Sequence, residues 1–189
     1  MWTDLPGGAS LRLFEESDAD ELYALVDRNR AHLEPWMPWV PGVRGPADQL
    51  EFIRASRRQV ADNDGFQVGI VTADGALAGT AGFHGVSWLN RATSVGYWLG
   101  AEAQGRGLMT AAVRALIDHA FGAWALHRVV IEAAVDNARS RAIPERLGFR
   151  EEGVRREAER HGDRYRDLVD YGLLAPEWPT RAAPRPATR

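Results

Sequence analysis

The seven residues from Gln104 to Thr110, Gln-Gly-Arg-Gly-Leu-Met-Thr, have the composition of a phosphate-binding loop. Gly105 and Gly107 carry no β-carbon, so a ligand can approach the backbone closely. An amphipathic pattern from Leu108 onward predicts a helix whose first N–H groups have no intrahelical partner. These groups, together with the helix dipole, favour a phosphate at this end. A tight strand-to-helix turn without a ligand is the alternative interpretation.

Two other phosphate-binding motifs do not match this loop. A P-loop requires Gly-Lys followed by Ser or Thr, and all 23 basic residues of this chain are arginine. The dinucleotide-binding fingerprint requires a third glycine, where this sequence has Thr110. Both classes are therefore excluded.

Composition also limits the chemistry of the site. The absence of cysteine excludes a disulfide framework, a cysteine-based zinc site and a cysteine nucleophile, and the absence of lysine excludes a Schiff base. The histidines show no metal-ligand spacing, so we predict no metal. His84 ends a predicted strand near the expected cleft and is a candidate general base, because the ordinary pKa of histidine suits that task, although a lone histidine is more often structural.

The elements that must position these residues form one α+β domain. The chain has 189 residues and predicts a domain over 1–175, followed by a Pro- and Arg-rich tail over 176–189 that we expect to be disordered. Alternating and β-branched runs predict strands, and apolar stripes predict helices, which gives the order β-α-α-β-β-β-α-β-α-β-β. Only the unit from Thr93 to Ala133 requires a parallel crossover.

The predicted elements cover most of the chain. Strands are expected at 10–14, 66–71, 76–84, 93–99, 127–133, 149–160 and 164–174. Helices are expected from 17 or 18 to 29, at 46–60, from 108 onward, and from 136 or 137 to 147. The net charge of -3 does not fit a nucleic-acid-binding protein. No apolar run is long enough to span a membrane and no signal peptide is indicated, so we expect a cytoplasmic protein.

The loop from Gln104 to Thr110 resembles the acetyl-CoA pyrophosphate loop of the GCN5-related N-acetyltransferases (GNAT superfamily), with the methionine typical of the RimJ/RimL-type ribosomal-protein branch. The resemblance extends from about Leu11 to Leu174. It implies the GNAT fold, with a mostly antiparallel sheet of about seven strands, helices on both faces and a splay between the two central strands. It also implies acetyl-CoA as cosubstrate and possible homodimer formation. The residues implied to bind the cofactor are Trp98, Leu99, Gln104, Gly105, Arg106, Gly107, Met109, Thr110 and Asn137.

Two catalytic residues are implied by the same resemblance. Many family members use a tyrosine as the acid toward the thiolate, but this chain has Pro144 at that position. The RimL-like branch places a serine where Ser140 stands, so Ser140 is the expected hydrogen-bond donor to the sulfur. Glu159 falls on the position of the RimL-type general base, within a segment similar to Arg-Glu-Ala-Glu-x-x-Asn-Gly-Arg-Tyr-x-Asp. Alternatively, Ser140 is a solvated helix residue and Glu159 a charge on an exposed strand.

The acceptor amine is the open question at this stage. Trp36 and Trp39 lie in a proline-rich loop, which either covers the core or lines the acceptor site, and Tyr97 and His84 complete the expected acceptor-binding set. The resemblance implies acetylation of a ribosomal or other protein N-terminus. A small amine such as an amino acid, an aminoacyl nucleotide or an antibiotic is almost equally compatible, because a fold does not encode its substrate. A non-catalytic CoA-binding module is the remaining alternative.

Overall fold

One mixed sheet of eight strands runs through the protein, seen in a computed structural model that describes residues 2–179. The strand order is β1-β2-β3-β4-β5-β6-β8-β7, and every neighbouring pair is antiparallel except β5 and β6. The strands are β1 (Trp2–Asp4), β2 (Ser10–Leu13), β3 (Gln67–Val71), β4 (Leu77–Ser87), β5 (Ala92–Leu99), β6 (Arg128–Ala134), β7 (Arg150–His161) and β8 (Arg164–Leu174).

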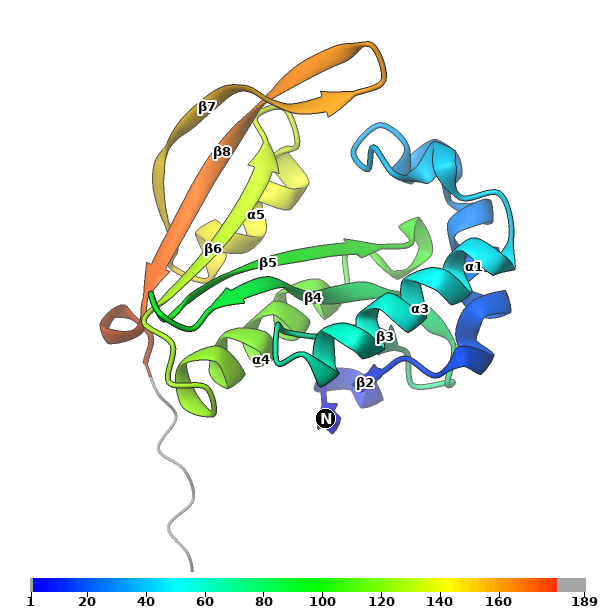
Figure 1. Cartoon of the computed structure of the whole chain (residues 1–189), viewed down its shortest axis with the longest axis horizontal. Helices are drawn as coiled ribbons and strands as arrows, with labels where there is room; N and C mark the ends of the chain where they lie inside the picture. Colours follow the sequence, from blue (N-terminus) through cyan, green and yellow to red (C-terminus); the bar gives the residue numbers. More distant parts are fainter. Residues whose placement is uncertain (1, 180–189) are drawn as a thin grey trace, which may run out of the picture.

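Helices cover both faces of the sheet (Figure 1). Their bounds are α1 (Ala19–Arg28), α2 (Arg30–Leu33), α3 (Pro46–Ala61), α4 (Leu108–Gly122) and α5 (Ala138–Arg146). One apolar cluster joins the buried face of α4 and Ile143 of α5 to the sheet. A second cluster joins α1 and α3 to the opposite face, where Trp98 points. The predicted α+β arrangement with two covered faces is therefore confirmed.

The sheet opens between its two central strands. β5 and β6 pair only at Ala92–Arg128, Thr93–Val129 and Ser94–Val130, although both strands continue well beyond these pairs. Figure 1 shows β6 and β8 diverging from β4 and β5 beyond this short contact. The splay inferred from the family resemblance is confirmed, and it leaves the backbone of residues 95–99 on one side of an opening.

A bulge in β4 and a bulge in β7 interrupt the regular pairing of these two strands. β4 carries one extra residue between Phe83 and Val86, and Gly85 there has a φ of +72°. β7 carries two extra residues between Arg155 and Glu159, where Glu157 has a φ of +50°. Bulges bend a strand and redirect its side chains. They lie next to His84 and Glu159, the two candidate bases.

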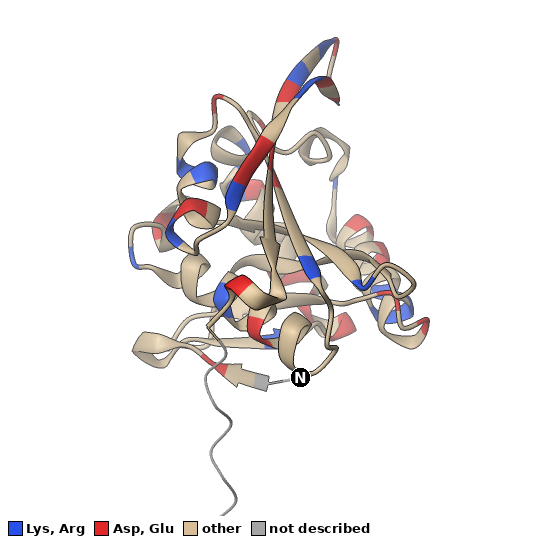
Figure 2. Ribbon diagram, turned by 90° about the vertical axis from the view of Figure 1, so that its left-hand side faces the viewer, with Lys and Arg blue, Asp and Glu red and all other residues tan. Residues whose placement is uncertain are grey.

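Charged residues of both signs are mixed along the β7–β8 hairpin (Figure 2). Arg155 contacts Asp170 at 2.8 Å and Glu132 at 2.7 Å, and Arg128 pairs with Glu152. These exposed pairs each stabilise the fold by little, about 0–1 kcal/mol. The hairpin therefore depends on the buried side chains of β8, such as Val169 and Tyr171, for its attachment.

Two features at the chain ends differ from the expectations. The strand β1 was not predicted, because three residues without alternation give no usable signal, and it raises the strand count from about seven to eight. Trp178 falls within the predicted tail, but its side chain is only 5% exposed and its indole N–H donates to Asp118 at 2.7 Å. The ordered part thus extends past residue 176. The expected disorder of 181–189 lies outside the described residues.

The short helix α2 was also not predicted, because its four residues run from the end of the first predicted helix into the proline-rich loop. Within residues 2–179, no helix is long and apolar enough to cross a membrane.

Candidate active site

The loop before α4 has the backbone that its glycines predict. Gly105 and Gly107 have φ values of +75° and +74°, in the left-handed region that residues with a β-carbon rarely adopt. Gly107 is the N-cap of α4, so the N–H groups of the first turn follow it without intrahelical partners. These donors and the positive end of the 15-residue helix favour an anion.

Neighbouring side chains hold this loop in place. The Gln104 amide donates from Nε2 to His32 Nε2 at 2.8 Å, and Arg139 donates to the Gln104 Oε1 at 3.2 Å. The buried Asn29 accepts a hydrogen bond from the Ala101 N–H at 2.9 Å, just before the loop. The roles of His32, Arg139 and Asn29 were not predicted, because no sequence pattern connects them to partners that lie 35 to 72 positions away.

The loop forms one wall of a large cavity of about 1750 Å³. Arg106 is the one residue of the predicted cofactor set that is not in the cavity wall, and its side chain is exposed. The others line the cavity: Trp98, Leu99, Gln104, Gly105, Gly107, Met109, Thr110 and Asn137. Arg114, Arg139 and Arg146 add three cations to the wall.

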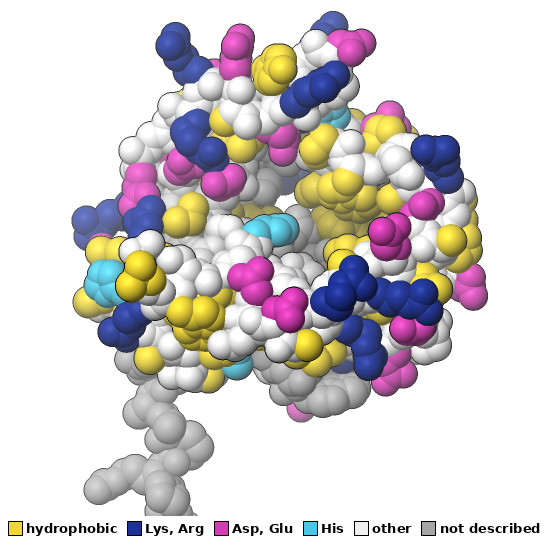
Figure 3. All heavy atoms as spheres, in the orientation of Figure 1, with side chains coloured by type: hydrophobic (Ala, Val, Ile, Leu, Met, Phe, Trp, Pro, Cys, Tyr) yellow, Lys and Arg dark blue, Asp and Glu magenta, His cyan; other side chains and the backbone are white. Residues whose placement is uncertain are grey.

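A second cavity of about 780 Å³ lies on the other side of the splay. Its wall includes Trp36, Trp39, His84 and Glu159, which come from three different parts of the chain. Figure 3 shows the face of the molecule hollowed between the β7–β8 hairpin and the segment after α1. The two cavities share the wall residues Trp36, Met37, Tyr97, Trp98, Asn137 and Ser140. They meet where β5 faces the N-terminus of α5.

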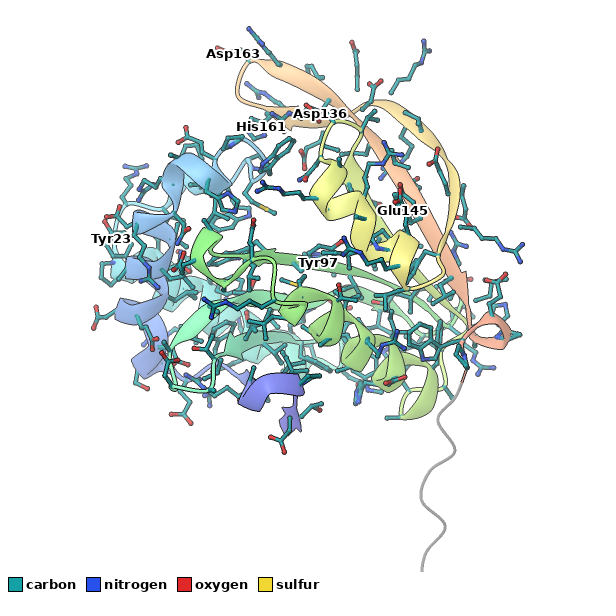
Figure 4. All side chains as sticks on the ribbon, turned by 180° about the vertical axis from the view of Figure 1, so that it is seen from behind. Tyr23, Tyr97, Asp136, Glu145, His161 and Asp163 are labelled. Carbon is teal, nitrogen blue, oxygen red and sulfur yellow. The ribbon has the colours of Figure 1, made fainter. Side chains whose placement is uncertain are left out.

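The two tryptophans are each packed against another side chain. Trp39 contacts Trp98 with ring centroids 6.0 Å apart, and the Arg166 guanidinium lies 5.5 Å from the Trp36 ring centroid. One nitrogen of Arg166 and Nδ1 of His161 are buried without a hydrogen-bond partner among the described residues. Figure 4 shows His161 at the end of the β7–β8 hairpin, which faces the loop that carries the tryptophans.

His84 lies at the bulge in β4, next to the opening of the sheet. Its ring is exposed toward the cavity, yet the protein atoms around it disfavour the charged form and lower its pKa. Glu132 of β6 opposes this shift by its negative charge. His84 is therefore mostly neutral near pH 7, which a proton acceptor must be.

Glu159 faces the same cavity from β7. Burial raises the pKa of Glu159, and the charge of Glu132 raises it further, while His161 and Arg166 lower it. The net shift is upward. A carboxylate with a raised pKa is a stronger base, so this environment suits the removal of a proton from an amine.

Two further polar residues of this cavity were missed in the sequence. Glu132 is the one acid in the otherwise apolar run Val-Val-Ile-Glu-Ala-Ala of β6, and this interruption was the available signal. Gln49 of α3 is only 4% exposed and lines the cavity. No group of acidic and histidine residues within 2–179 could hold a metal ion.

Comparison with known proteins identifies related sequences. The family model described as an acetyltransferase (GNAT) domain matches residues 10–150. The protein YdaF of Bacillus subtilis (strain 168), which carries the assignment of a ribosomal N-acetyltransferase, is 40% identical over 170 residues. This alignment covers 89% of the present chain and 92% of YdaF.

Two solved structures are similar over nearly their full length. RimL, a ribosomal L7/L12 α-N-protein acetyltransferase in complex with coenzyme A, superposes with a TM-score of 0.87 at 26% identity and covers 92% of this chain and 98% of RimL. The microcin C7 self-immunity acetyltransferase MccE, in complex with acetyl-CoA and AMP, has a TM-score of 0.84 at 30% identity, with 89% and 97% covered.

Proposed function

Because the chain belongs to the GNAT acetyltransferase family, we propose that it transfers an acetyl group from acetyl-CoA to the α-amine of a protein N-terminus. Membership makes it an acetyl-CoA-dependent N-acetyltransferase. The observation that carries the acceptor and site assignment is the meeting of two cavities at Ser140, one beside an anion-binding loop and the other beside Glu159 and His84.

The larger cavity fits acetyl-CoA. The left-handed Gly105 and Gly107 and the N-terminus of α4 suit its diphosphate, and Arg139 and Gln104 lie beside them. The backbone of residues 97–99 borders the same cavity and suits the amide groups of the pantetheine arm. Acetyl-CoA supplies an activated thioester, so no covalent enzyme intermediate is needed.

The chemistry then requires one proton acceptor and one hydrogen-bond donor. The amine nitrogen forms a bond to the acetyl carbon, the carbon–sulfur bond breaks, and its electron pair stays on sulfur. Glu159 takes the proton that the amine loses, directly or through a water, and the Ser140 hydroxyl donates to the sulfur. Coenzyme A resembles a thiol of pKa about 8.5, so a hydrogen bond is sufficient to stabilise it near neutral pH.

Three considerations support an N-terminal acceptor. An α-amine has a pKa of about 8 and is partly neutral at pH 7, whereas a lysine amine near 10.4 is almost fully protonated. RimL is named for the α-amine of a ribosomal protein, and YdaF carries a ribosomal assignment. The carboxylates of Glu132 and Glu159 in the acceptor cavity also favour a group that arrives as a cation.

A small amine that carries an aromatic ring is the second candidate. Trp36 and Trp39 expose part of their surface to the acceptor cavity and can stack on a ring. MccE, similar over most of its length, was crystallised with AMP as well as acetyl-CoA.

The test measures thiol release from acetyl-CoA with peptides that begin with Ser or Ala, with free amino acids, and with amine-bearing nucleosides and antibiotics. The matched control is each peptide with a blocked N-terminus and an internal lysine, and mass spectrometry locates the acetyl group. Turnover of the free peptides alone supports the proposal. Turnover of only the small amines would support the second candidate, and binding of acetyl-CoA without any turnover would point to a CoA-binding module.

We also propose that the enzyme acts in the cytoplasm, where ribosomal proteins and acetyl-CoA occur, and that it forms a homodimer. Light scattering after size-exclusion chromatography tests the dimer, and a single species near 20.9 kDa would contradict it.

A further inference from the structure

Pro144 leaves a backbone acceptor free inside α5. A residue at this position normally donates its N–H to the carbonyl four residues earlier, here that of Ser140, but proline has no N–H. The Tyr97 hydroxyl donates to this carbonyl at 3.1 Å. A side chain from β5 thus supplies the hydrogen bond that the helix lacks, and Figure 4 shows Tyr97 close to α5.

The same hydroxyl lies beside the Ser140 side chain. Ser140 Oγ is 3.4 Å from Tyr97 Oη, and the Ser140 N–H donates to Asn137 Oδ1 at 3.1 Å. The backbone of Ser140 is therefore held on both its N–H and its carbonyl, while its hydroxyl is still able to turn toward a ligand. Both Tyr97 and Ser140 line the two cavities where these meet.

We propose that Tyr97 is a positioning residue for Ser140: by binding the carbonyl that Pro144 leaves free, its hydroxyl fixes the Ser140 hydroxyl for donation to the departing sulfur. This inference rests on the proposed role of Ser140 in acetyl transfer. It also explains how a chain with proline at the usual tyrosine position can keep a defined geometry at that point of the helix.

Tyr97 does not itself supply a proton in this arrangement. Burial raises the pKa of Tyr97 to about 12, partly offset by the hydrogen bond with Ser140. A thiolate whose conjugate acid has a pKa of about 8.5 cannot take a proton from such a phenol to a useful extent. The Tyr97 O–H stays on the Ser140 carbonyl while the sulfur receives the electron pair of the broken bond and the hydrogen bond from Ser140.

A double-mutant cycle of Tyr97→Phe and Pro144→Ala tests the proposal. In the Pro144 background we expect Tyr97→Phe to lower kcat by about fivefold to tenfold, the effect of one hydrogen bond, with KM for acetyl-CoA within about twofold. Pro144→Ala restores an N–H that can donate to the Ser140 carbonyl. In that background we expect Tyr97→Phe to cost less than about twofold, because the carbonyl has its own donor.

Tyr171→Phe is the matched control. The Tyr171 hydroxyl also ties α5 to the sheet, since it accepts from Arg141 and donates to Glu145, each at 2.9 Å, but it lines neither cavity. We expect this variant to lower Tm and to leave kcat unchanged. Tyr97→Phe in a Ser140→Ala background is a second measurement, and it should cause no further loss of kcat.

The proposal would be overturned if Tyr97→Phe lowered kcat equally in the presence and absence of Pro144→Ala. It would also be overturned if Tyr97→Phe lowered kcat further in the Ser140→Ala background. Each variant is also assayed for slow hydrolysis of acetyl-CoA without an acceptor, which breaks the same carbon–sulfur bond. If only the acceptor assignment is wrong, the double-mutant cycle measured by acetyl-CoA hydrolysis should still show that the effect of Tyr97→Phe depends on Pro144. If the Tyr97 inference is wrong, the effect of Tyr97→Phe on hydrolysis should be the same with and without Pro144→Ala.

Discussion

Gly96 leaves room for the ring of His84, because a Cβ built on Gly96 would overlap His84 Nε2. The ring therefore lies over β5 at the point where the sheet opens. Gly96→Ala forces the ring to move, which is possible at modest cost in stability because the colliding atom is at the end of a side chain. We expect kcat/KM for the acceptor to fall by about tenfold, since the cavity wall is displaced.

The His84 pKa reports this movement directly. The protein atoms packed around the ring lower this pKa in the native protein, so displacement of the ring from β5 should raise it toward 6.5 in Gly96→Ala, as measured by NMR titration. His84→Ala combined with Gly96→Ala serves as control, and the added methyl group should cost little stability there. An unchanged His84 pKa in Gly96→Ala would contradict the prediction.

Glu159→Gln should reduce kcat by about 10²-fold to 10³-fold, the usual effect of removing a general base. Glu157→Gln is the control, because Glu157 lies in the adjacent bulge, is exposed and lines neither cavity. The acidic limb of the native pH–rate profile should lie above the range of an ordinary glutamate, since the pKa of Glu159 is raised. A limb that persists in Glu159→Gln and disappears in His84→Gln would assign the base to His84.

The same substitution should stabilise the protein near neutral pH. A carboxyl whose pKa is raised by folding stabilises the folded state at low pH, and that contribution is lost as the pH rises through the folded-state pKa. Glu159→Gln should therefore raise Tm at pH 7 and leave it unchanged in acid below the unfolded-state pKa. Thermal unfolding at both pH values checks the sign.

Gly107→Ala should weaken acetyl-CoA binding. Its φ of +74° places an alanine in the left-handed region, at a cost of about 1–2 kcal/mol per residue. Relief of this strain would rotate the N–H groups that begin α4. We expect KM for acetyl-CoA to rise at least several-fold, measured by thiol release. Gly122→Ala at the other end of α4 has open space and no positive φ, and it should leave this KM unchanged.

Asn29→Leu should impair both stability and acetyl-CoA binding. The buried amide donates to the Leu25 carbonyl at 3.0 Å and accepts from the Ala101 N–H at 2.9 Å, so its loss leaves two backbone groups unpaired. We expect a stability loss of about 1–3 kcal/mol in urea unfolding and a raised KM for acetyl-CoA. The adjacent exposed pair Arg28–Glu102 offers a control, because Arg28→Gln should change neither quantity appreciably.

Much of the fold was predictable because its signals are local. Pro46 at the first turn and an apolar stripe marked α3 to within one residue, and the β-branched run from Arg128 marked β6. By contrast, β1 is too short to carry a pattern, and Trp178 stands among prolines and arginines whose composition suggests disorder. Its burial depends on Arg114 and Asp118 of α4, which lie 60 or more positions earlier.

The candidate site was predictable where one segment carries it. Gly105 and Gly107 each favour a positive φ at their own position, so the loop could be recognised from seven residues. The approach of Tyr97 to Ser140 depends on the splay between β5 and β6. Glu159 and His84 line the same cavity because of a bulge in each of their strands. Such contacts arise from the way strands are bent and paired, and no short sequence pattern records them.

Only three residue pairs join β5 to β6, so the sheet consists of two blocks, β1 to β5 and β6 to β8, which are each well paired internally. A ligand whose amides pair with residues 97–99 acts on this sheet as an added strand does. Its binding should slow hydrogen–deuterium exchange at these amides, because they open to solvent less often while they are paired. Cosubstrate occupancy should thus determine the local stability of this part of β5 as well as turnover.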